Sequence, residues 1–230
     1  MTEAAPPETR RKASRAIRRQ QLIDATIGAL ARKGYAEMTI ADVARAAGLS
    51  AGIVIFHFAS KDELLASALR ALSEEYFGNW SRALAEAGPS PKARLAALLL
   101  ADFDAILFTP QKLAAWIAFW GESQGRPVYD QICGSYDKRR RDACLRCCAD
   151  LIGNDGGDPN LIMLCLDALG DGLWLSMASA GSGLAGRITA EEAKLIMQSA
   201  LAAHFPRVYP MPKPEGRTSE SPFRTAKESL

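Results

Sequence analysis

The chain has 230 residues, of which 48% are hydrophobic and 23% are charged, and such a composition is typical of a folded protein with one or two domains. A formal net charge of only +2 excludes a uniformly basic protein, and an odd number of cysteines, five, argues against a disulfide framework. We find no leader segment and no uninterrupted apolar run of about 18 residues, so we expect a cytoplasmic protein without a membrane partner.

Basic residues are concentrated near the N-terminus, where only Glu3 and Glu8 oppose them. They are Arg10, Arg11, Lys12, Arg15, Arg18 and Arg19. Because prolines precede this cluster and no steady apolar period runs through it, we predict a flexible basic arm over residues 1–16 and a first helix that begins near Ala16. Such an arm either inserts into a DNA minor groove or is simply solvated.

Capping signals and glycines predict a series of helices after the arm. An apolar stripe predicts that the first helix runs to Gly34. The following start signals are Thr39 with Asp42, Ser50, and Ser60 with Glu63. They predict helices over 40–47 and 51–57 and a longer helix from about residue 61.

Longer apolar helices are predicted in the rest of the chain. The breaks between them are expected at residues 109–110, 125–127, 153–159 and 181–186. No segment alternates polar and apolar residues with a period of two, and no internal repeat is found. We therefore predict an all-α protein.

Residues 40–57 have the lengths of a helix-turn-helix, in which the second helix enters the DNA major groove and the first braces it. The turn residue Gly48 can adopt the positive φ that closes the angle. The stretch TIADVARAAGLSAGIVIFHFASKDELL, residues 39–65, resembles the DNA-binding domain of the TetR family, and the resemblance extends over about residues 18–66.

This resemblance implies a ligand-responsive transcriptional repressor that binds a palindromic double-stranded DNA operator as a homodimer, with no cofactor. The implied DNA-binding residues are Arg18, Thr39, Arg45, Ser50, Ala51, Gly52, Ile53, Ile55, Phe56, His57 and Lys61. Thr39, His57 and Lys61 are expected to contact phosphates, which accept hydrogen bonds from such groups. Gly52 is expected to let the second helix lie close to DNA.

The second helix departs from the family pattern at Ile55, where a tyrosine is usual. Its side chains at positions 51, 53, 55 and 56 are apolar, so they can touch thymine methyl groups but cannot form paired hydrogen bonds with guanine or adenine. Sequence discrimination is therefore expected to depend on the basic arm or on Arg45.

Residues 113–120, LAAWIAFW, and 171–175, DGLWL, resemble the C-terminal domain of the choline-responsive, BetI-like repressors. Aromatic faces beside a carboxylate suit a quaternary ammonium ion, and Trp116, Phe119 and Trp120 share one helical face. The predicted ligand-binding residues are Trp116, Phe119, Trp120, Glu122, Asp171 and Trp174, with Asp102 and Asp104 as further candidate carboxylates. The alternative is that these aromatic residues are simply core.

Three cysteines, Cys144, Cys147 and Cys148, fall on one helical face and suggest an alternative, a regulator of the same type that responds to a metal or an oxidant. Cysteine is also a small and readily buried core residue. An enzyme is not expected, because we find no nucleophile with a base, no metal site and no phosphate loop.

The predicted domains follow from these assignments. They are a basic arm over 1–16, a three-helix helix-turn-helix domain over 17–66, a helical ligand-binding and dimerisation domain over 67–205 and a disordered tail over 206–230. In the third of these, helices 159–180 and 189–205 carry more apolar surface than one partner helix covers. By the family resemblance, they are expected to pair across a twofold axis.

Overall fold

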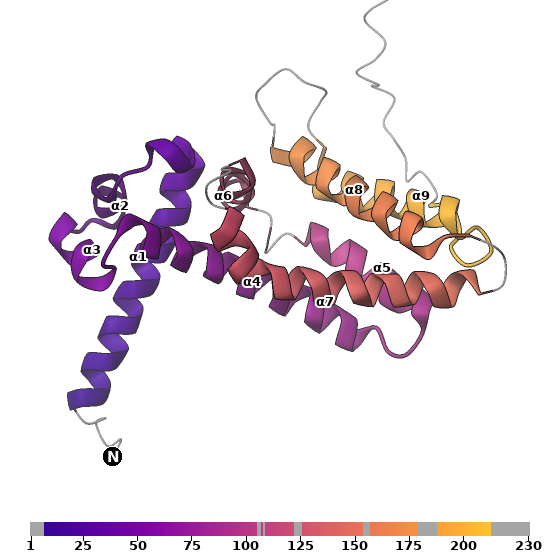
Figure 1. Ribbon diagram of the computed structural model, residues 1–230, viewed down its shortest axis with the longest axis horizontal. Helices are drawn as coiled ribbons and strands as arrows, with labels where there is room; N and C mark the ends of the chain where they lie inside the picture. Colours follow the sequence, from indigo (N-terminus) through magenta and orange to yellow (C-terminus); the bar gives the residue numbers. More distant parts are fainter. Residues whose placement is uncertain are drawn as a thin grey trace, which may run out of the picture. The chain divides into compact units, whose positions relative to one another are not determined.

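The computed structural model describes residues 7–104, 107, 109–121, 126–153, 157–178 and 188–212, and all regular elements among them are helical (Figure 1). The elements are α1 (Pro7–Glu37), α2 (Ile40–Ala47), α3 (Ala51–His57), α4 (Lys61–Glu86), α5 (Pro91–Leu100), the 3-10 turn η1 (Ala101–Phe103), α6 (Pro110–Gly121), α7 (Arg126–Ile152), α8 (Pro159–Ala178) and α9 (Ala190–His204). The prediction of an all-α fold is confirmed.

The chain divides into two compact units that do not follow the predicted boundary after residue 66. The first comprises Met1–Asn79 and Ala105–Arg140, and the second comprises Trp80–Asp104 and Arg141–Leu230. Helix α4 continues through residue 66 because no glycine or proline interrupts it there. Helix α6 belongs to the first unit because it packs against α1.

Helices α2 and α3 form the predicted helix-turn-helix. The Thr39 hydroxyl accepts a hydrogen bond from the Asp42 backbone N–H, and the Asp42 carboxylate accepts one from the Thr39 N–H, so the predicted capping box is present. Gly48 ends α2 with a φ of 66°, in the left-handed region. The chain bends by 104° between the two helices, within the range of this motif.

Helix α1 begins at Pro7, earlier than the predicted start near Ala16. Proline is favoured in the first helical turn, and the residues that follow it, largely Arg, Lys and Ala, are good helix formers. The positive charges of this segment therefore do not prevent a helix. The predicted stop is found at Gly34, where φ is 73° and the helix is interrupted.

Two side chains of α1 hold the helix-turn-helix in place. Gln21 Nε2 donates a hydrogen bond to the Ala47 carbonyl at the end of α2, at 2.8 Å. Arg19 donates to the His57 carbonyl at the end of α3, at 2.6 Å, and its guanidinium lies 4.1 Å from the centre of the Phe58 ring. Carbonyls at helix ends lack partners within the helix, so α1 supplies them.

The second unit is organised around α8 and α9, which lie side by side (Figure 1). The predicted disordered tail starts too early, because Tyr209 is buried and donates a hydrogen bond to the Lys92 carbonyl at 2.6 Å. The aromatic rings of Phe205 and Tyr209 supply the apolar surface that packs this segment. Residues 213–230 of the predicted tail lie outside the described residues.

Among the helices of the described ranges, α8 is the single helix that is long and apolar enough to cross a membrane, judged by length and composition only. Of its most apolar 18-residue stretch, 28% is buried inside the protein. A core helix of a folded protein passes the same test. Three leucines on α8, Leu161, Leu164 and Leu175, are exposed and contribute to its apolar surface.

Candidate functional site

Helix α3 separates into a buried side and an open side. Val54 and His57 face the core, together with Phe58, which follows the helix. The exposed residues are Ala51, Gly52, Ile53, Ile55 and Phe56. The side chain of Phe56 is the most open of the large apolar ones, with 72% of its surface exposed. Five of the residues predicted to face DNA therefore lie on the open side of α3, whereas His57, which was also predicted to contact DNA, faces the core.

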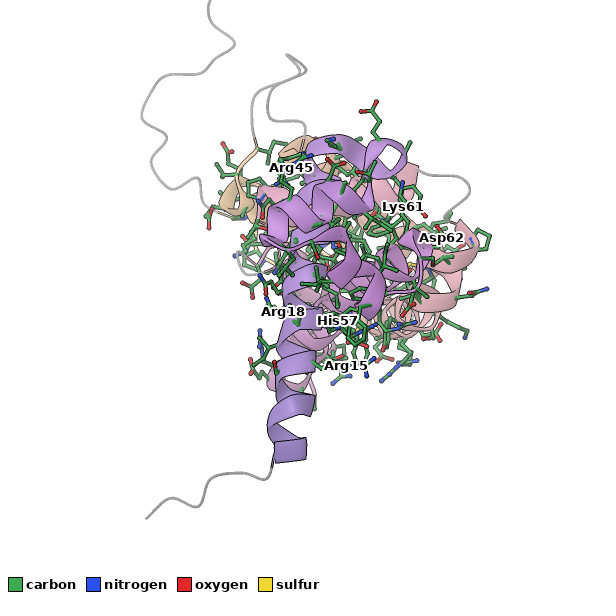
Figure 2. All side chains as sticks on the ribbon, turned by 90° about the vertical axis from the view of Figure 1, so that its left-hand side faces the viewer. Arg15, Arg18, Arg45, His57, Lys61 and Asp62 are labelled. Carbon is green, nitrogen blue, oxygen red and sulfur yellow. The ribbon has the colours of Figure 1, made fainter. Side chains whose placement is uncertain are left out.

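Positive charge lies beside this open side. The Arg15 guanidinium of α1 lies 5.9 Å from the centre of the Phe56 ring, and the Arg18 guanidinium donates a hydrogen bond to Gln21 on the same helix. Figure 2 shows Arg15 and Arg18 near His57, where α1 passes the end of α3. Arginine side chains in this position can pair with phosphates of a bound duplex.

Lys61, a predicted phosphate contact, has a second task within the fold. Its ammonium donates hydrogen bonds to the Tyr35 and Ala36 carbonyls, at 3.2 and 3.3 Å, and so joins the start of α4 to the end of α1. An ammonium group carries three donors, so one N–H remains for a phosphate. The phosphate contact of Lys61 stays a prediction.

Thr39 is engaged by the fold in a similar way. Its hydroxyl donates to the Asp42 carboxylate at 2.6 Å, in addition to the capping bonds. A phosphate at this end of α2 would therefore meet the first backbone N–H groups of the helix, which a helix N-terminus directs outward. Ser50 occupies the corresponding position before α3 and makes no side-chain capping bond, unlike the prediction.

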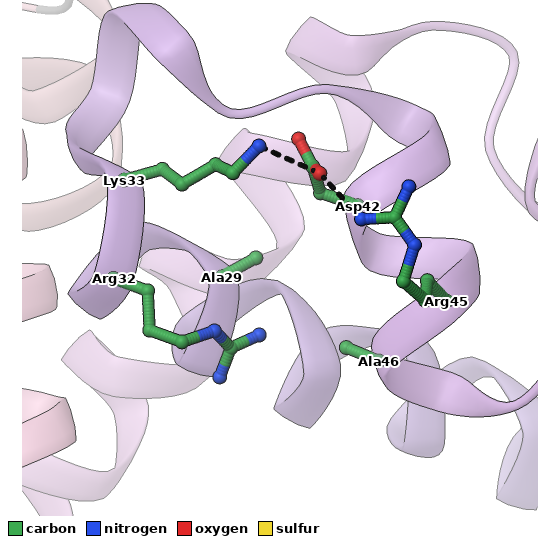
Figure 3. A pocket seen from close by; sticks show the side chains of 6 residues that line it. All are labelled: Ala29, Arg32, Lys33, Asp42, Arg45 and Ala46. Carbon is green, nitrogen blue, oxygen red and sulfur yellow. Dashed lines mark hydrogen bonds and ion pairs between the residues drawn. The ribbon is translucent and has the colours of Figure 1, made fainter.

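Asp42 is the electrostatic centre of α2. Figure 3 shows its carboxylate between Lys33, at 2.8 Å, and Arg45, at 3.4 Å. The hydrogen bond from Lys33, followed by that from Thr39, holds the pKa of Asp42 well below its usual range. Because one carboxylate faces two cations, this corner of the motif keeps a net positive charge.

A pocket of about 160 Å³ adjoins this ion pair. Its lining residues are Ala29, Arg32, Lys33, Asp42, Arg45 and Ala46 (Figure 3). Small-molecule sites in proteins usually measure about 300–1,000 Å³. We therefore assign no effector to this pocket.

His57 lies at the end of α3 with only 9% of its surface exposed, and its Nδ1 atom is buried without a hydrogen-bond partner. Burial lowers the pKa of His57, and the charges of Arg15, Arg19 and Arg18 lower it further. A phosphate contact by His57, which stays a prediction, would have to use the small part of the ring that reaches the surface.

Replacing His57 by glutamine is expected to make thermal stability less sensitive to acid. The folded state holds the proton of His57 more weakly than the unfolded state does, so its stabilising effect is complete above pH 6.5 and is lost as the pH falls below that value. Melting temperatures measured from pH 8 to pH 5.5 should therefore fall more for the wild type than for His57→Gln. Equal slopes of melting temperature against pH in the wild type and in His57→Gln would refute the assignment.

An aromatic cluster forms where α4, α6 and α7 meet within the first unit. The ring of Trp116 lies 6.2 Å from Tyr76, 6.3 Å from Trp120 and 6.4 Å from Tyr129, measured between ring centres. Trp120 Nε1 donates a hydrogen bond to the Tyr129 hydroxyl at 3.3 Å. We call these four residues the aromatic cluster.

Negative charge lies next to the aromatic cluster. Burial raises the pKa of Tyr129, and the charge of Asp137 on the same helix raises it further. Burial likewise raises the pKa of Cys133 to about 11, with contributions from Asp137 and Asp130. Aromatic faces with a nearby carboxylate are the surroundings that a quaternary ammonium ion prefers.

The remaining predicted ligand residues occupy other surroundings. The Phe119 ring packs edge-on against Tyr35 of α1, at 5.8 Å between centres. In the second unit, Trp174 is buried and donates a hydrogen bond to the Asp102 carbonyl at 3.2 Å, while Asp171 is exposed. Glu122 lies outside the described residues. A site built jointly from Trp116, Trp120 and Trp174 stays a prediction, because these residues belong to different units.

The clustered cysteines are buried, which disfavours the thiolate form. Burial raises the pKa of Cys147, and it raises that of Cys148 to about 12. Metal binding and oxidation both require a thiolate. Within the described ranges, no group of three or more potential ligands is placed to hold a metal ion.

Three residues at the aromatic cluster, Tyr76, Tyr129 and Asp137, were not predicted from the sequence, and Arg19 was expected only as one of the N-terminal basic residues and not as the residue that holds the end of α3. A same-face pattern detects neighbours along one helix only. Tyr76 and Tyr129 reach Trp116 from two other helices, so no spacing in the sequence connects them.

Two family models match the chain. Residues 22–68 match bacterial regulatory proteins of the tetR family, and residues 91–206 match the C-terminal domain of BetI-type transcriptional repressors. The HTH-type transcriptional regulator BetI of Burkholderia thailandensis is 34% identical over 179 residues, which cover 73% of this chain and 85% of that protein.

Solved structures share the fold. A transcriptional regulator from Pseudomonas aeruginosa PAO1 is 27% identical, with a TM-score of 0.64 over 89% of this chain and 96% of that one. A transcriptional regulator from Saccharomonospora viridis, solved in complex with choline, is 22% identical, with a TM-score of 0.64 over 81% of this chain and 95% of that one.

Proposed function

Because the chain belongs to the TetR family of transcriptional regulators and carries a BetI-type C-terminal domain, we propose that it is a cytoplasmic, homodimeric repressor. In this proposal, it binds a palindromic operator and releases it when a quaternary ammonium compound such as choline binds the aromatic cluster. The observation that carries the effector assignment is the cluster itself, four aromatic side chains with Asp137 close by.

The DNA-binding part of the proposal is supported by the open side of α3 and by the arginines beside it. Gly52 adds a specific argument. A methyl group placed on Gly52 would meet only the Ser50 hydroxyl, at 3.8 Å, so nothing within the protein requires a glycine there. Glycine has a lower helix propensity than alanine, and its presence in the first turn of α3 is explained if the backbone must approach DNA closely.

Replacing Gly52 by alanine is therefore expected to stabilise the protein by about 0.5–1 kcal/mol and to weaken DNA binding. Thermal melts and fluorescence anisotropy with a labelled operator measure the two effects. Gly78→Ala is the matched control, because Gly78 lies exposed in α4 with open space around its Cβ position. It should stabilise the protein without weakening operator binding; equal binding by Gly52→Ala would contradict the close approach.

The dimer is supported by exposed leucines on α8. Leu161, Leu164 and Leu175 are each more than half exposed, and Leu195 and Ile196 of the adjacent α9 are also exposed. The intervening Ala168 and Gly172 are small and exposed and would let a second helix approach closely. Two copies of this face would bury one another in a four-helix bundle, as twofold interfaces do.

The effector is supported by the chemistry of the aromatic cluster. A tetraalkylammonium ion donates no ordinary hydrogen bonds, so its site must offer aromatic faces and negative charge. Such a ligand acts only through a different affinity for the two states of the repressor. Helix α6 carries Trp116 and Trp120 and also packs against α1, so a ligand that shifts α6 can displace the helix that holds α2 and α3.

Titrating choline into the protein and into its operator complex tests the effector. We expect binding and operator release, and about tenfold weaker binding by Trp120→Leu, which loses the aromatic face. The neutral analogue 3,3-dimethyl-1-butanol, which has the shape of choline without its charge, should bind more weakly still. Phe77→Leu is the matched control and should bind choline as the wild type does. The Arg139 guanidinium lies 4.8 Å from the centre of the Phe77 ring, so this aromatic face is already covered by a cation.

Three results would contradict the choline assignment. They are no binding of choline by calorimetry, equal binding of the neutral analogue, and an unchanged affinity in Trp120→Leu. The alternative of a metal or redox signal is less favoured, because burial holds Cys147 and Cys148 in the thiol form.

A further inference from the structure

We infer that α3 recognises thymine methyl groups, so that A·T base pairs define the operator where this helix faces the major groove. The inference rests on the proposed operator binding and names the base chemistry that the helix selects. It follows from the composition of the open side of α3, from the charges beside that side and from Gly52.

The open side of α3 offers no hydrogen-bonding side chain. It consists of Ala51, Gly52, Ile53, Ile55 and Phe56. The only polar side chain within the helix is that of His57, and it is buried. Guanine, cytosine and adenine present hydrogen-bonding groups in the major groove, whereas thymine also presents its C5 methyl group. The thymine methyl is therefore the one base feature that these side chains match.

The charges beside α3 indicate that the occupant of this apolar face is DNA rather than another protein. Arg15 lies against the Phe56 ring, and Arg45 is exposed on the preceding helix. An apolar protein partner would cover these arginines without neutralising them, which costs free energy. The major groove places thymine methyls between two rows of phosphates, so it satisfies the apolar face and the arginines together.

The backbone of α3 permits the required approach. A methyl contact needs the isoleucine and phenylalanine side chains to reach the floor of the groove, because apolar atoms gain from contact only within about 4 Å. Gly52 lies on the same open side and carries no side chain that would hold the helix away from DNA. Ile55 and Phe56 both lie on the open side but point about 100° apart around the helix axis, so they can contact different base pairs.

The test uses duplexes that the full-length protein selects from a random library. Thymines within each half-site are replaced one at a time by uracil, which removes the methyl group and keeps the base pairing. We expect about fourfold weaker binding for each contacted methyl, the equivalent of one buried methyl group. In Phe56→Ala and Ile55→Ala, the penalty should disappear at the thymine that the missing side chain touches. Met211→Ala, which removes an exposed side chain outside the helix-turn-helix, should keep every penalty.

The possible failures are distinguishable. If the selected duplexes bind equally well with uracil in place of thymine, the inference is overturned and operator binding stands. If the penalties persist unchanged in Phe56→Ala and Ile55→Ala, the methyl groups act through DNA shape and the inference is again overturned. If the library yields no enriched sequence, the proposed operator binding itself fails, and the inference fails with it.

Discussion

Replacing Leu164 and Leu175 of α8 together by glutamate is expected to give a monomer and to weaken operator binding by about two to four orders of magnitude. The two leucines lie on one face of α8, and both are more than half exposed in the single chain. In the proposed dimer they become buried, and an unpaired carboxylate in their place would be strongly destabilising. A monomer contacts one half-site only. In a dimer, binding of the first half-site brings the second copy of α3 to the other half-site at a high effective concentration, and a monomer loses this advantage.

Sedimentation velocity and fluorescence anisotropy with the operator measure the two effects on one sample. Met211→Glu introduces the same charge at an apolar side chain that is exposed outside α8 and α9, and it should remain dimeric. A Leu164→Glu/Leu175→Glu protein that stays dimeric would show that another surface forms the interface. Circular dichroism checks that the monomer keeps its helices.

Replacing Phe58 by alanine is expected to lower the free energy of unfolding by about 3–5 kcal/mol, as for other buried aromatic residues. The ring of Phe58 is 1% exposed and supports the Arg19 guanidinium, which in turn holds the end of α3. The change therefore removes core volume and a contact between α1 and α3 at once. Chemical denaturation measured by circular dichroism gives the free energy.

Phe56 provides the matched control for Phe58, two residues away on the same segment. Its ring is largely exposed, so Phe56→Ala should change the free energy of unfolding by less than about 0.5 kcal/mol. At a temperature where both variants are folded, Phe56→Ala should lose more operator affinity than Phe58→Ala. Equal destabilisation by the two substitutions would contradict the assigned burial.

The helix-turn-helix was predictable because its signals are local. The Thr39–Asp42 capping box, the positive φ of Gly48 and the hydrogen bonds of Glu63 with Ala59 and Ser60 all involve residues within a few positions of one another. Each is also a strong backbone preference with a known mechanism. The breaks before α6, α7 and α8 were predictable for the same reason, since proline occurs in the first turn of each.

The remaining features depend on contacts between distant parts of the chain. The aromatic cluster combines α4, α6 and α7, so the predicted single-helix face included Phe119, which packs on Tyr35, and omitted Tyr76 and Tyr129. The hydrogen bond from the Tyr209 hydroxyl to the Lys92 carbonyl joins positions far apart in sequence. Composition alone predicted disorder there, because the segment is rich in proline. A composition average does not register that two aromatic rings, Phe205 and Tyr209, pack the segment.

The continuity of α4 has a consequence for exchanging parts between related regulators. The sequence motifs suggest interchangeable modules joined after the helix-turn-helix. In the structure, however, α6 packs against α1 in the first unit. Helices α4 and α7 each have residues in both units. A chimera cut at residue 66 would pair α1 of one parent with α6 of the other, across an interface that was never selected to fit. Transfer of effector specificity between such proteins therefore requires α1 and α6 from the same parent.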